Sequence, residues 1–290
     1  MSSVHRILTG LTFVPDPTTD RVNWPAETED LVRLSIELAR VTHSGLAFAA
    51  VAEPPTEECD CEQIDSWMAA AEQQVWELGR SASAGEFPTE QAAWFGNPAE
   101  EWAESARDSE MDLLIVPGAG SSGTTDVDLL DLTWPEVAGC PVWYAGREPD
   151  YLAGEPPLVV FCDDLSDESA VHLPLAVELA LAWNARLLIV HPLSQPLSEL
   201  TQDDIDRLRR EVFVKLSRSD FRALMQGSQL RLVTGGVEEI LAEVSSEQSP
   251  NLVLASAGSV RGFRPQWRGH LLLWPKLAAD AEQESDTRIG

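Results

Sequence analysis

The chain of 290 residues carries 48 acidic and 20 basic side chains, which gives a formal net charge of −28. A field of this sign repels the phosphate backbone of DNA and RNA, so nucleic acid is excluded as an expected partner. No apolar run approaches the about 18 residues of a membrane helix, and the N-terminal MSSVHRILTG lacks a secretory pattern, so we expect a cytoplasmic protein without membrane association.

The first 146 residues alternate between short apolar runs and amphipathic stretches. The pattern predicts strands at 4–12, 45–51, 91–95, 112–116 and 141–145, and helices at 27–43, 60–82, 98–109 and 126–138. Short strands joined through helices run parallel by right-handed crossovers. The alternation therefore predicts an α/β fold, a doubly wound parallel sheet of Rossmann-like strand order 3-2-1-4-5.

The second half repeats this order at a nearly constant spacing. Glu37-Leu38-Ala39 recurs 141 residues later, Gly96 matches Gly235 at 139, and residues 111–118 match 250–257 at 139. A fourth block, Leu132 to Ala138, matches Leu272 to Ala278 at 140. We therefore predict two domains in tandem, at 1–146 and 157–280, with a linker at 147–156 and an acidic tail at 281–290.

The two halves differ at their ends. The first half has about ten extra residues within 13–27, and this proline-rich insertion predicts a surface loop. The second half has no apolar run after Trp274-Pro275 to match residues 141–145, which predicts a sheet of four strands or one completed by a strand from elsewhere. The alternative is that residues 270–274 form the fifth strand and that the match of Trp134-Pro135 with Trp274-Pro275 is accidental.

The cysteines suggest core positions more than chemistry. Cys140 and Cys162 lie in apolar runs, where cysteine packs as a small hydrophobic residue. Cys59 and Cys61 form a C-x-C pair in an acidic stretch, but no second ligand pair is near, so we expect no metal site. No G-x-S-x-G turn is present, and His191 at a strand end is expected to be structural, so we expect no catalytic residue.

Several strand ends carry short motifs, namely Cys162-Asp163, Ile189-Val190-His191, Phe95-Gly96-Asn97-Pro98, Pro117 to Gly123, and Cys140-Pro141-Val142. In this order and spacing they resemble the universal stress protein family over nearly the whole chain. The resemblance implies an ATP site in which the first-strand aspartate lies near the adenosine and a glycine loop cradles the phosphates. The candidate nucleotide-binding residues that it implies are Asp163, Val190, Gly235, Gly258, Gly118, Gly120 and Gly123.

Neither half carries the full nucleotide signature. In the first half Thr12 replaces the aspartate, and Thr133-Trp134, separated from Gly120 to Gly123 by nine residues, stands where Gly-Ser or Gly-Thr belongs. In the second half Ala255-Ser256-Ala257-Gly258 replaces the first glycine pair. A cluster of three arginines follows it and is either a phosphate grip or a solvated loop: Arg261, Arg264 and Arg268.

These patterns favour a stress-response or regulatory binding factor that is not a catalyst, has weak or lost ATP binding and needs no cofactor. We expect the chain to associate with a second copy, or its two domains to pair with each other. A small molecule or another protein is a further expected partner. One alternative is an adenine-nucleotide-binding protein that hydrolyses ATP slowly through Asp163 and the arginines of 261–268. Another is a purely structural dimerisation module.

Overall fold

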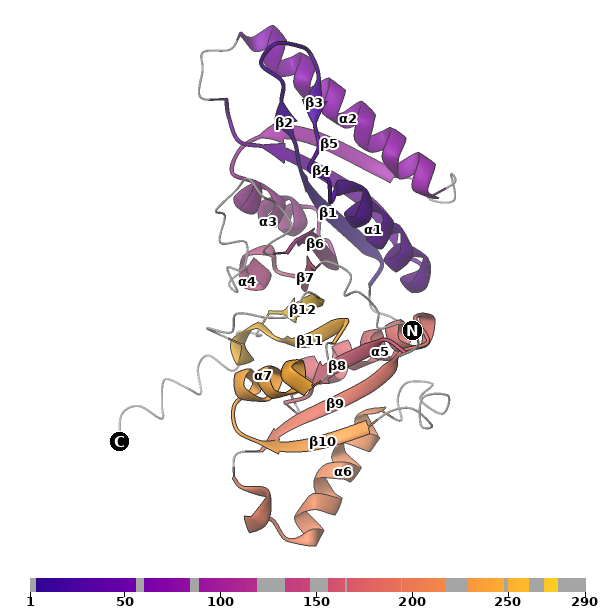
Figure 1. Ribbon diagram of the computed structural model, residues 1–290, viewed down its shortest axis with the longest axis vertical. Helices are drawn as coiled ribbons and strands as arrows, with labels where there is room; N and C mark the ends of the chain where they lie inside the picture. Colours follow the sequence, from indigo (N-terminus) through magenta and orange to yellow (C-terminus); the bar gives the residue numbers. More distant parts are fainter. Residues whose placement is uncertain are drawn as a thin grey trace, which may run out of the picture. The chain divides into compact units, whose positions relative to one another are not determined.

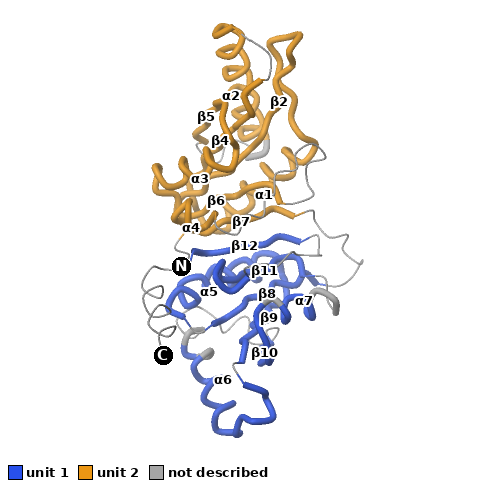
Figure 2. Tube along the Cα trace, turned by 90° about the vertical axis from the view of Figure 1, so that its left-hand side faces the viewer, with its two compact units in different colours: residues 1–3, 147–290 blue, residues 4–146 orange. Residues whose placement is uncertain are grey.

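The computed structural model describes residues 4–55, 60–83, 89–118, 134–146, 156–164, 166–193, 195–216, 229–247, 250–260 and 269–275. The chain forms two compact units, one of residues 4–146 and one of residues 147–290, here called the first and second halves (Figure 2). The predicted acidic tail and nearly all of the predicted linker lie outside the described residues.

The first half contains a parallel sheet in the order β5-β4-β1-β6-β7 (Figure 1). Its strands are β1 (Arg6–Thr12), β4 (Gly45–Ala52), β5 (Thr89–Phe95), β6 (Leu113–Pro117) and β7 (Val142–Ala145). In chain order this is 3-2-1-4-5, so the predicted topology is confirmed. The strands β1, β4 and β6 are buried almost throughout, as expected for a sheet covered by helices on both faces.

Among the described residues of this half, four helices cover the sheet, with α1 packed on α2 and α3 packed on α4. They are α1 (Thr28–Thr42), α2 (Cys61–Ser83), α3 (Pro98–Asp108) and α4 (Trp134–Ala138). Helix α3 begins where Asn97 accepts a hydrogen bond from the backbone N–H of Ala99 and Pro98 takes the first helical position. Helix α1 ends at His43, whose left-handed conformation (φ 56°) directs its N–H to the Ala39 carbonyl.

The insertion of residues 13–27 is more ordered than the predicted loop. It contains a short antiparallel ladder between β2 (Val14–Pro15) and β3 (Val22–Asn23). The Asp16 carboxylate accepts hydrogen bonds from the hydroxyls of Thr18 and Thr19, at 2.7 and 2.9 Å, and thereby closes the turn between the two strands.

The second half repeats the sheet in the order β10-β9-β8-β11-β12. Its strands are β8 (Leu158–Cys162), β9 (Arg186–Leu193), β10 (Gln229–Thr234), β11 (Leu252–Ser256) and β12 (His270–Trp274). Its helices are α5 (Asp167–Ala182), α6 (Gln202–Leu216) and α7 (Val237–Glu247), with 3₁₀ turns η1 (Leu197–Glu199) and η3 (Ala257–Ser259). The Ser166 hydroxyl caps α5 by accepting from the Ser169 N–H.

The prediction of a missing fifth strand was wrong, and the alternative is correct. Residues 270–274 form β12, which pairs with β11 in parallel. Trp134 begins α4, whereas Trp274 ends a strand, so the Trp-Pro match is accidental. The physical reason is the length of the last crossover, which spans residues 118–141 in the first half but only 257–269 in the second.

Both predicted core cysteines are buried. Cys140 is 3% exposed and Cys162 is 4% exposed. Burial raises the pKa of each thiol to about 12, so neither is a reactive thiolate near neutral pH. Across the part of the chain that the structure describes, no helix combines the length and apolar character needed to cross a bilayer.

Candidate functional site

In each half the strand order reverses beside the first strand. Strands β4 and β6 flank β1, and β9 and β11 flank β8. In doubly wound sheets, ligands bind outside the carboxyl ends of the strands at this reversal. The site to compare between halves is therefore formed by the residues that end β1 and β6, and those that end β8 and β11.

The strand register shows which residues are equivalent at this point. Gly10 pairs with Ala49, and Cys162 pairs with Val190, the residue 141 positions after Ala49. The next residues along the first strands are therefore Leu11 and Asp163. This corrects the expectation that Thr12 replaces the aspartate: the residue in its place is Leu11, which is 1% exposed.

Asp163 lies at the start of the β8–α5 connection and is 1% exposed. Its backbone N–H donates to the Val190 carbonyl at 2.9 Å. Its carboxylate accepts a hydrogen bond from the hydroxyl of Ser169, in the first turn of α5. The carboxylate thus ties the end of β8 to the beginning of α5, where the helix dipole also favours a negative charge.

His191 completes this buried group of polar contacts. Its Nδ1 lies 2.7 Å from the backbone carbonyl oxygen of Asp163, and the side chain is 6% exposed. Because a carbonyl oxygen only accepts, Nδ1 carries the proton in this contact. His191 therefore holds the end of β9 to the end of β8.

The candidate glycines have packing reasons to be glycine. The Gly118 N–H donates to the Ala145 carbonyl at 2.8 Å, and a Cβ at Gly118 would lie 2.7 Å from that oxygen. Gly235 has φ +121° in the turn between β10 and α7, and a Cβ there would lie 2.6 Å from a Glu239 carboxylate oxygen. Both positions require glycine without any bound phosphate.

The structure brings only part of the candidate set together. Asp163 and Val190 meet at the ends of β8 and β9, and Gly258 lies in η3, directly after the neighbouring β11. Gly235 follows β10, which is separated from β8 by β9. The remaining candidates lie outside the described residues, namely Gly120, Gly123, Arg261, Arg264 and Arg268.

An aromatic cluster that was not predicted from the sequence anchors the insertion in the first half. Phe13 directly follows β1, and its ring lies 5.9 Å from Trp24 and 5.7 Å from Phe95 at the end of β5. Trp67 of α2 lies 6.3 Å from Phe95 and donates its indole N–H to the Thr19 carbonyl at 2.8 Å. The signal was the presence of Phe13 and Trp24 in a segment expected to be a surface loop.

A second missed feature is the contact between Gly10 and Trp102 in the first half. The Trp102 indole is fully buried and donates to the Ala49 carbonyl at 3.1 Å. A Cβ at Gly10 would lie 2.5 Å from the indole ring, so this position must be glycine. At the repeat spacings the second half carries Cys162 and Leu241 at these positions, a larger residue on the strand and a smaller one on the helix.

In the second half, Trp274 lies in a stack of aromatic rings. Its ring centroid lies 5.6 Å from Phe161 of β8 and 5.0 Å from His172 of α5. Burial lowers the pKa of His172 to about 4, so this ring is neutral near pH 7.

Metal-ligating side chains do not gather into a site within the described residues. No group of three His, Cys, Asp or Glu side chains among them has the proximity to hold an ion. Of the C-x-C pair, Cys61 is exposed at the start of α2 and Cys59 lies outside the described residues.

Comparison with known proteins finds similarity in structure alone. No family model matches the sequence. No curated protein matches it either. Solved structures do match over nearly the whole chain. A protein of unknown function from Pseudomonas aeruginosa PAO1 has a TM-score of 0.61 at 14% identity, with 99% of this chain and 98% of that chain covered.

Two further matches are universal stress proteins by description. A candidate universal stress protein from Pseudomonas aeruginosa UCBPP-PA14 has a TM-score of 0.61 at 15% identity and covers 99% of this chain and 98% of its own. A universal stress protein from Archaeoglobus fulgidus DSM 4304 has a TM-score of 0.56 at 13% identity, covering 94% and 97%. The resemblance expected from the strand-end motifs is therefore confirmed as a shared fold.

Proposed function

Starting from the universal stress protein fold that spans both halves, we propose that this chain is a binding or regulatory factor of the universal stress type, not a catalyst, with weak or lost ATP binding. The observation that carries the proposal is the non-equivalence of Leu11 and Asp163 at the same register position. One half has no carboxylate there, and in the other the carboxylate is bonded to the protein itself.

In the first half, two features oppose nucleotide binding. Leu11 offers no polar group to a ribose or base, and its side chain is part of the core. The aromatic cluster of Phe13, Trp24 and Phe95 fixes the insertion beside the carboxyl ends of β1 and β5. A ligand at the end of β1 would therefore have to compete with residues of the chain itself.

In the second half, several polar atoms of the site already have internal partners. The Asp163 carboxylate accepts from the Ser169 hydroxyl, and the Val190 carbonyl accepts from the Asp163 N–H. A ligand that binds through Oδ1 or the N–H of Asp163 must replace these contacts, so its net affinity is its binding free energy less the free energy lost with them. This supports weak binding at most, of a ligand whose donors compete with a serine hydroxyl.

The proposal is tested by calorimetric titration of the full chain with ATP, ADP and AMP in the presence of Mg²⁺. We expect no saturable binding at micromolar affinity for any of the three. Micromolar binding of ATP that weakens progressively from ATP to AMP would overturn the proposal, because it would show a functioning phosphate cradle. Loss of that binding in Asp163→Asn, with an unchanged circular dichroism spectrum, would place the nucleotide in the second half.

The absence of catalysis is tested separately, by phosphate release from ATP. We expect the native chain and Asp163→Asn to release phosphate at the same background rate. A rate that exceeds background in the native chain and falls in the variant would establish the slow ATPase instead. A native mass spectrum of freshly purified protein would detect a co-purified ligand of another class.

A further inference from the structure

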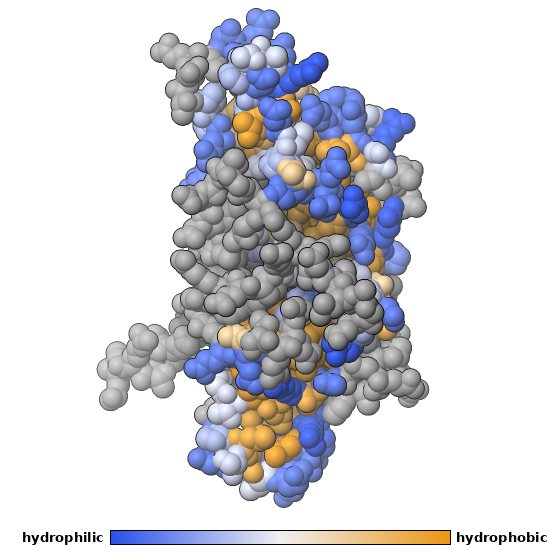
Figure 3. All heavy atoms as spheres, viewed as in Figure 1, coloured by the Kyte–Doolittle hydropathy of each residue, from blue (hydrophilic) through white to orange (hydrophobic). Residues whose placement is uncertain are grey.

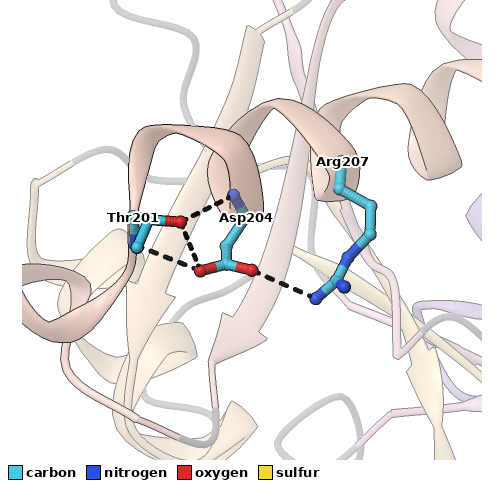
Figure 4. Close-up of polar contacts among 3 residues, drawn as sticks. All are labelled: Thr201, Asp204 and Arg207. Atoms are coloured by element: carbon cyan, nitrogen blue, oxygen red, sulfur yellow. Dashed lines mark hydrogen bonds and ion pairs between the residues drawn. The ribbon is translucent and has the colours of Figure 1, made fainter.

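The first turns of helix α6 of the second half are stabilised by contacts between their own residues. At its start the Thr201 hydroxyl donates to the Asp204 carboxylate at 2.6 Å, and the Asp204 N–H donates back to that hydroxyl oxygen at 3.3 Å (Figure 4). Arg207 pairs with the same carboxylate at 3.4 Å. This reciprocal capping box and the i,i+3 ion pair support a helix that lies on the surface.

The equivalent helix of the first half is, by contrast, deeply packed. Helix α2 buries Trp67, Ala71 and Val75, each at most 1% exposed. At the spacing of 141 residues, Leu208 of α6 stands where α2 has Trp67, yet Leu208 is only half-buried. None of the residues whose side chains are described on α6, which are 202–211 and Val214, is buried.

The strand next to α6 exposes apolar side chains on the same face. Arg231 of β10 points toward α7 on the opposite face, because it pairs with Glu243 at 2.9 Å. Side chains alternate along a strand, so Leu230 and Leu232 face the α6 side, and both are half-exposed. In the first half Gln91 and Ala93 hold these two positions.

We call a set of partly exposed apolar residues of η1, α6 and β10 the β10 surface. Its members are Leu197 of η1, which is 46% exposed, Ile205 and Leu208 of α6, and Leu230 and Leu232 of β10. Turn η1 joins the area because the Leu197 N–H donates to the Thr234 hydroxyl at the end of β10. Figure 3 shows apolar residues gathered in the lower part of the molecule, where Figure 1 places β10 and α6.

The two sheets also differ at their outer edge strands, β5 in the first half and β10 in the second. On β5 the exposed Glu72 carboxylate accepts a hydrogen bond from the Ala93 N–H at 3.3 Å, which protects that edge strand from pairing with another chain. The residue equivalent to Glu72 in the second half is Phe213, which has no acceptor group. Among the strands that the structure describes, β10 is the outermost of its sheet, and no described strand pairs with its outer edge.

Charge selects the occupant of this surface. Segment 197–216, which runs from η1 through α6, contains five acidic and four basic residues, in a chain whose net charge is −28. The acidic ones are Glu199, Asp203, Asp204, Asp206 and Glu211, and the basic ones are Arg207, Arg209, Arg210 and Lys215. A second copy that approaches with this same face meets less repulsion than one that approaches with the acidic remainder of its surface.

We propose that the β10 surface is a self-association interface that pairs two copies of this chain. The two β10 strands pair antiparallel about a two-fold axis perpendicular to the sheet. This symmetry keeps the α6 sides of both sheets on one face, so Leu230 and Leu232 of each copy pack beside those of the other. Net repulsion between two chains of charge −28 opposes the pairing, so salt strengthens it.

Sedimentation equilibrium of the full chain tests the proposal. In about 1 M salt, where the screening length is about 3 Å, we expect twice the 31.8 kDa chain mass, and in low salt a shift toward monomer. Leu230→Glu should weaken dimerisation at least tenfold, because it places like charges across the two-fold axis. The matched control is Gln91→Glu at the equivalent position of β5, which should leave the dimer unchanged.

Two outcomes would overturn the proposal. One is a monomer at about 100 μM protein at every salt concentration. The other is a dimer that persists unweakened in Leu230→Glu, because pairing would then use another surface. Hydrogen exchange of the native chain provides a readout that needs no variant: the β10 amides should gain protection with protein concentration in high salt, whereas the β5 amides should not.

Discussion

Leu11 and Asp163 occupy the same register position in the two sheets, one residue beyond the pairs Gly10–Ala49 and Cys162–Val190. Both side chains are 1% exposed. A buried leucine needs only apolar neighbours, whereas a buried carboxylate needs hydrogen-bond donors, which Asp163 finds in Ser169. The same position of one fold thus serves as a core residue in one half and as a polar tie in the other.

Exchange of these two residues should be costly in both directions. Asp163→Leu leaves the buried Ser169 hydroxyl without its acceptor, which costs about 1–3 kcal/mol of unfolding free energy. Leu11→Asp buries a carboxylate in an apolar site, and we expect a larger loss, about 3–5 kcal/mol. Urea denaturation followed by circular dichroism measures both. Equal stability of Leu11→Asp and the native chain would contradict the assignment of Leu11 to the core.

A side chain at position 10 should be tolerated only when Trp102 is replaced by a smaller residue. Gly10→Cys alone places a Cβ 2.5 Å from the indole and should destabilise by about 1–3 kcal/mol. Gly10→Cys with Trp102→Leu reproduces the pair found in the second half, Cys162 and Leu241, and should be more stable than the sum of the single losses implies. A double-mutant cycle in urea gives the coupling, and additive losses would show that the contact is not specific.

The insertion should loosen when its anchor on α2 is removed. Trp67→Phe keeps a ring in the cluster but deletes the hydrogen bond to the Thr19 carbonyl, at a cost of about 1 kcal/mol. Trypsin should then cut faster after the exposed Arg21. The matched control is Trp76→Phe on the same helix, whose indole contacts Arg80 at 5.0 Å and lies outside the cluster. Equal cleavage rates in the two variants would refute the anchoring role.

The free energy of unfolding of the second half should fall as the pH decreases from about 6.5 to about 4, because buried histidines titrate in this range. Burial lowers the pKa of His270 and His172 to about 4 in the folded chain, whereas unfolded histidine titrates near 6.5. The unfolded state therefore binds more protons below about pH 6.5. The stabilisation is complete above that pH and is lost progressively toward pH 4, where the folded rings also protonate.

The measurement is urea denaturation at several values of pH between 4 and 7. His270→Gln should have the shallower dependence, by up to about 1.4 kcal/mol per pH unit, since the carboxylates titrate in both proteins and cancel in the comparison. His270 is the better choice for substitution because it is 8% exposed, whereas His172 is only half-buried and contributes less. If the unfolding free energies of the native chain and His270→Gln changed equally with pH, protonation of His270 would be excluded as a cause of acid sensitivity.

The sheet could be predicted from the sequence because its signal is repeated twice. Short apolar strands alternate with amphipathic helices in each half, and a parallel α/β sheet follows from that alternation. The fifth strand of the second half was mistaken because the Trp134-Pro135 and Trp274-Pro275 pairs look alike. Whether a tryptophan begins a helix or ends a strand depends on the length of the crossover before it, which the local pattern does not reveal.

The candidate site was less predictable because the roles of its residues depend on contacts that the linear sequence does not reveal. Asp163 could be identified from its place after an apolar strand, but its bond to Ser169 depends on the path of the β8–α5 connection. The one-residue error that assigned Thr12 in place of Leu11 has the same origin, since an insertion follows that strand and obscures the alignment. Gly118 and Gly235 resemble parts of a phosphate loop in sequence, yet Gly118 is required by the nearby Ala145 carbonyl and Gly235 by its φ of +121°.

The pairing of Gly10 with Trp102 also means that the two halves are no longer exchangeable parts. A chain in which the second half's first strand replaced that of the first half would set Cys162 against Trp102, where no room exists for it. Domain shuffling between such duplicated units is therefore limited to whole halves. Recombination inside a half would have to carry the strand and its covering helix together.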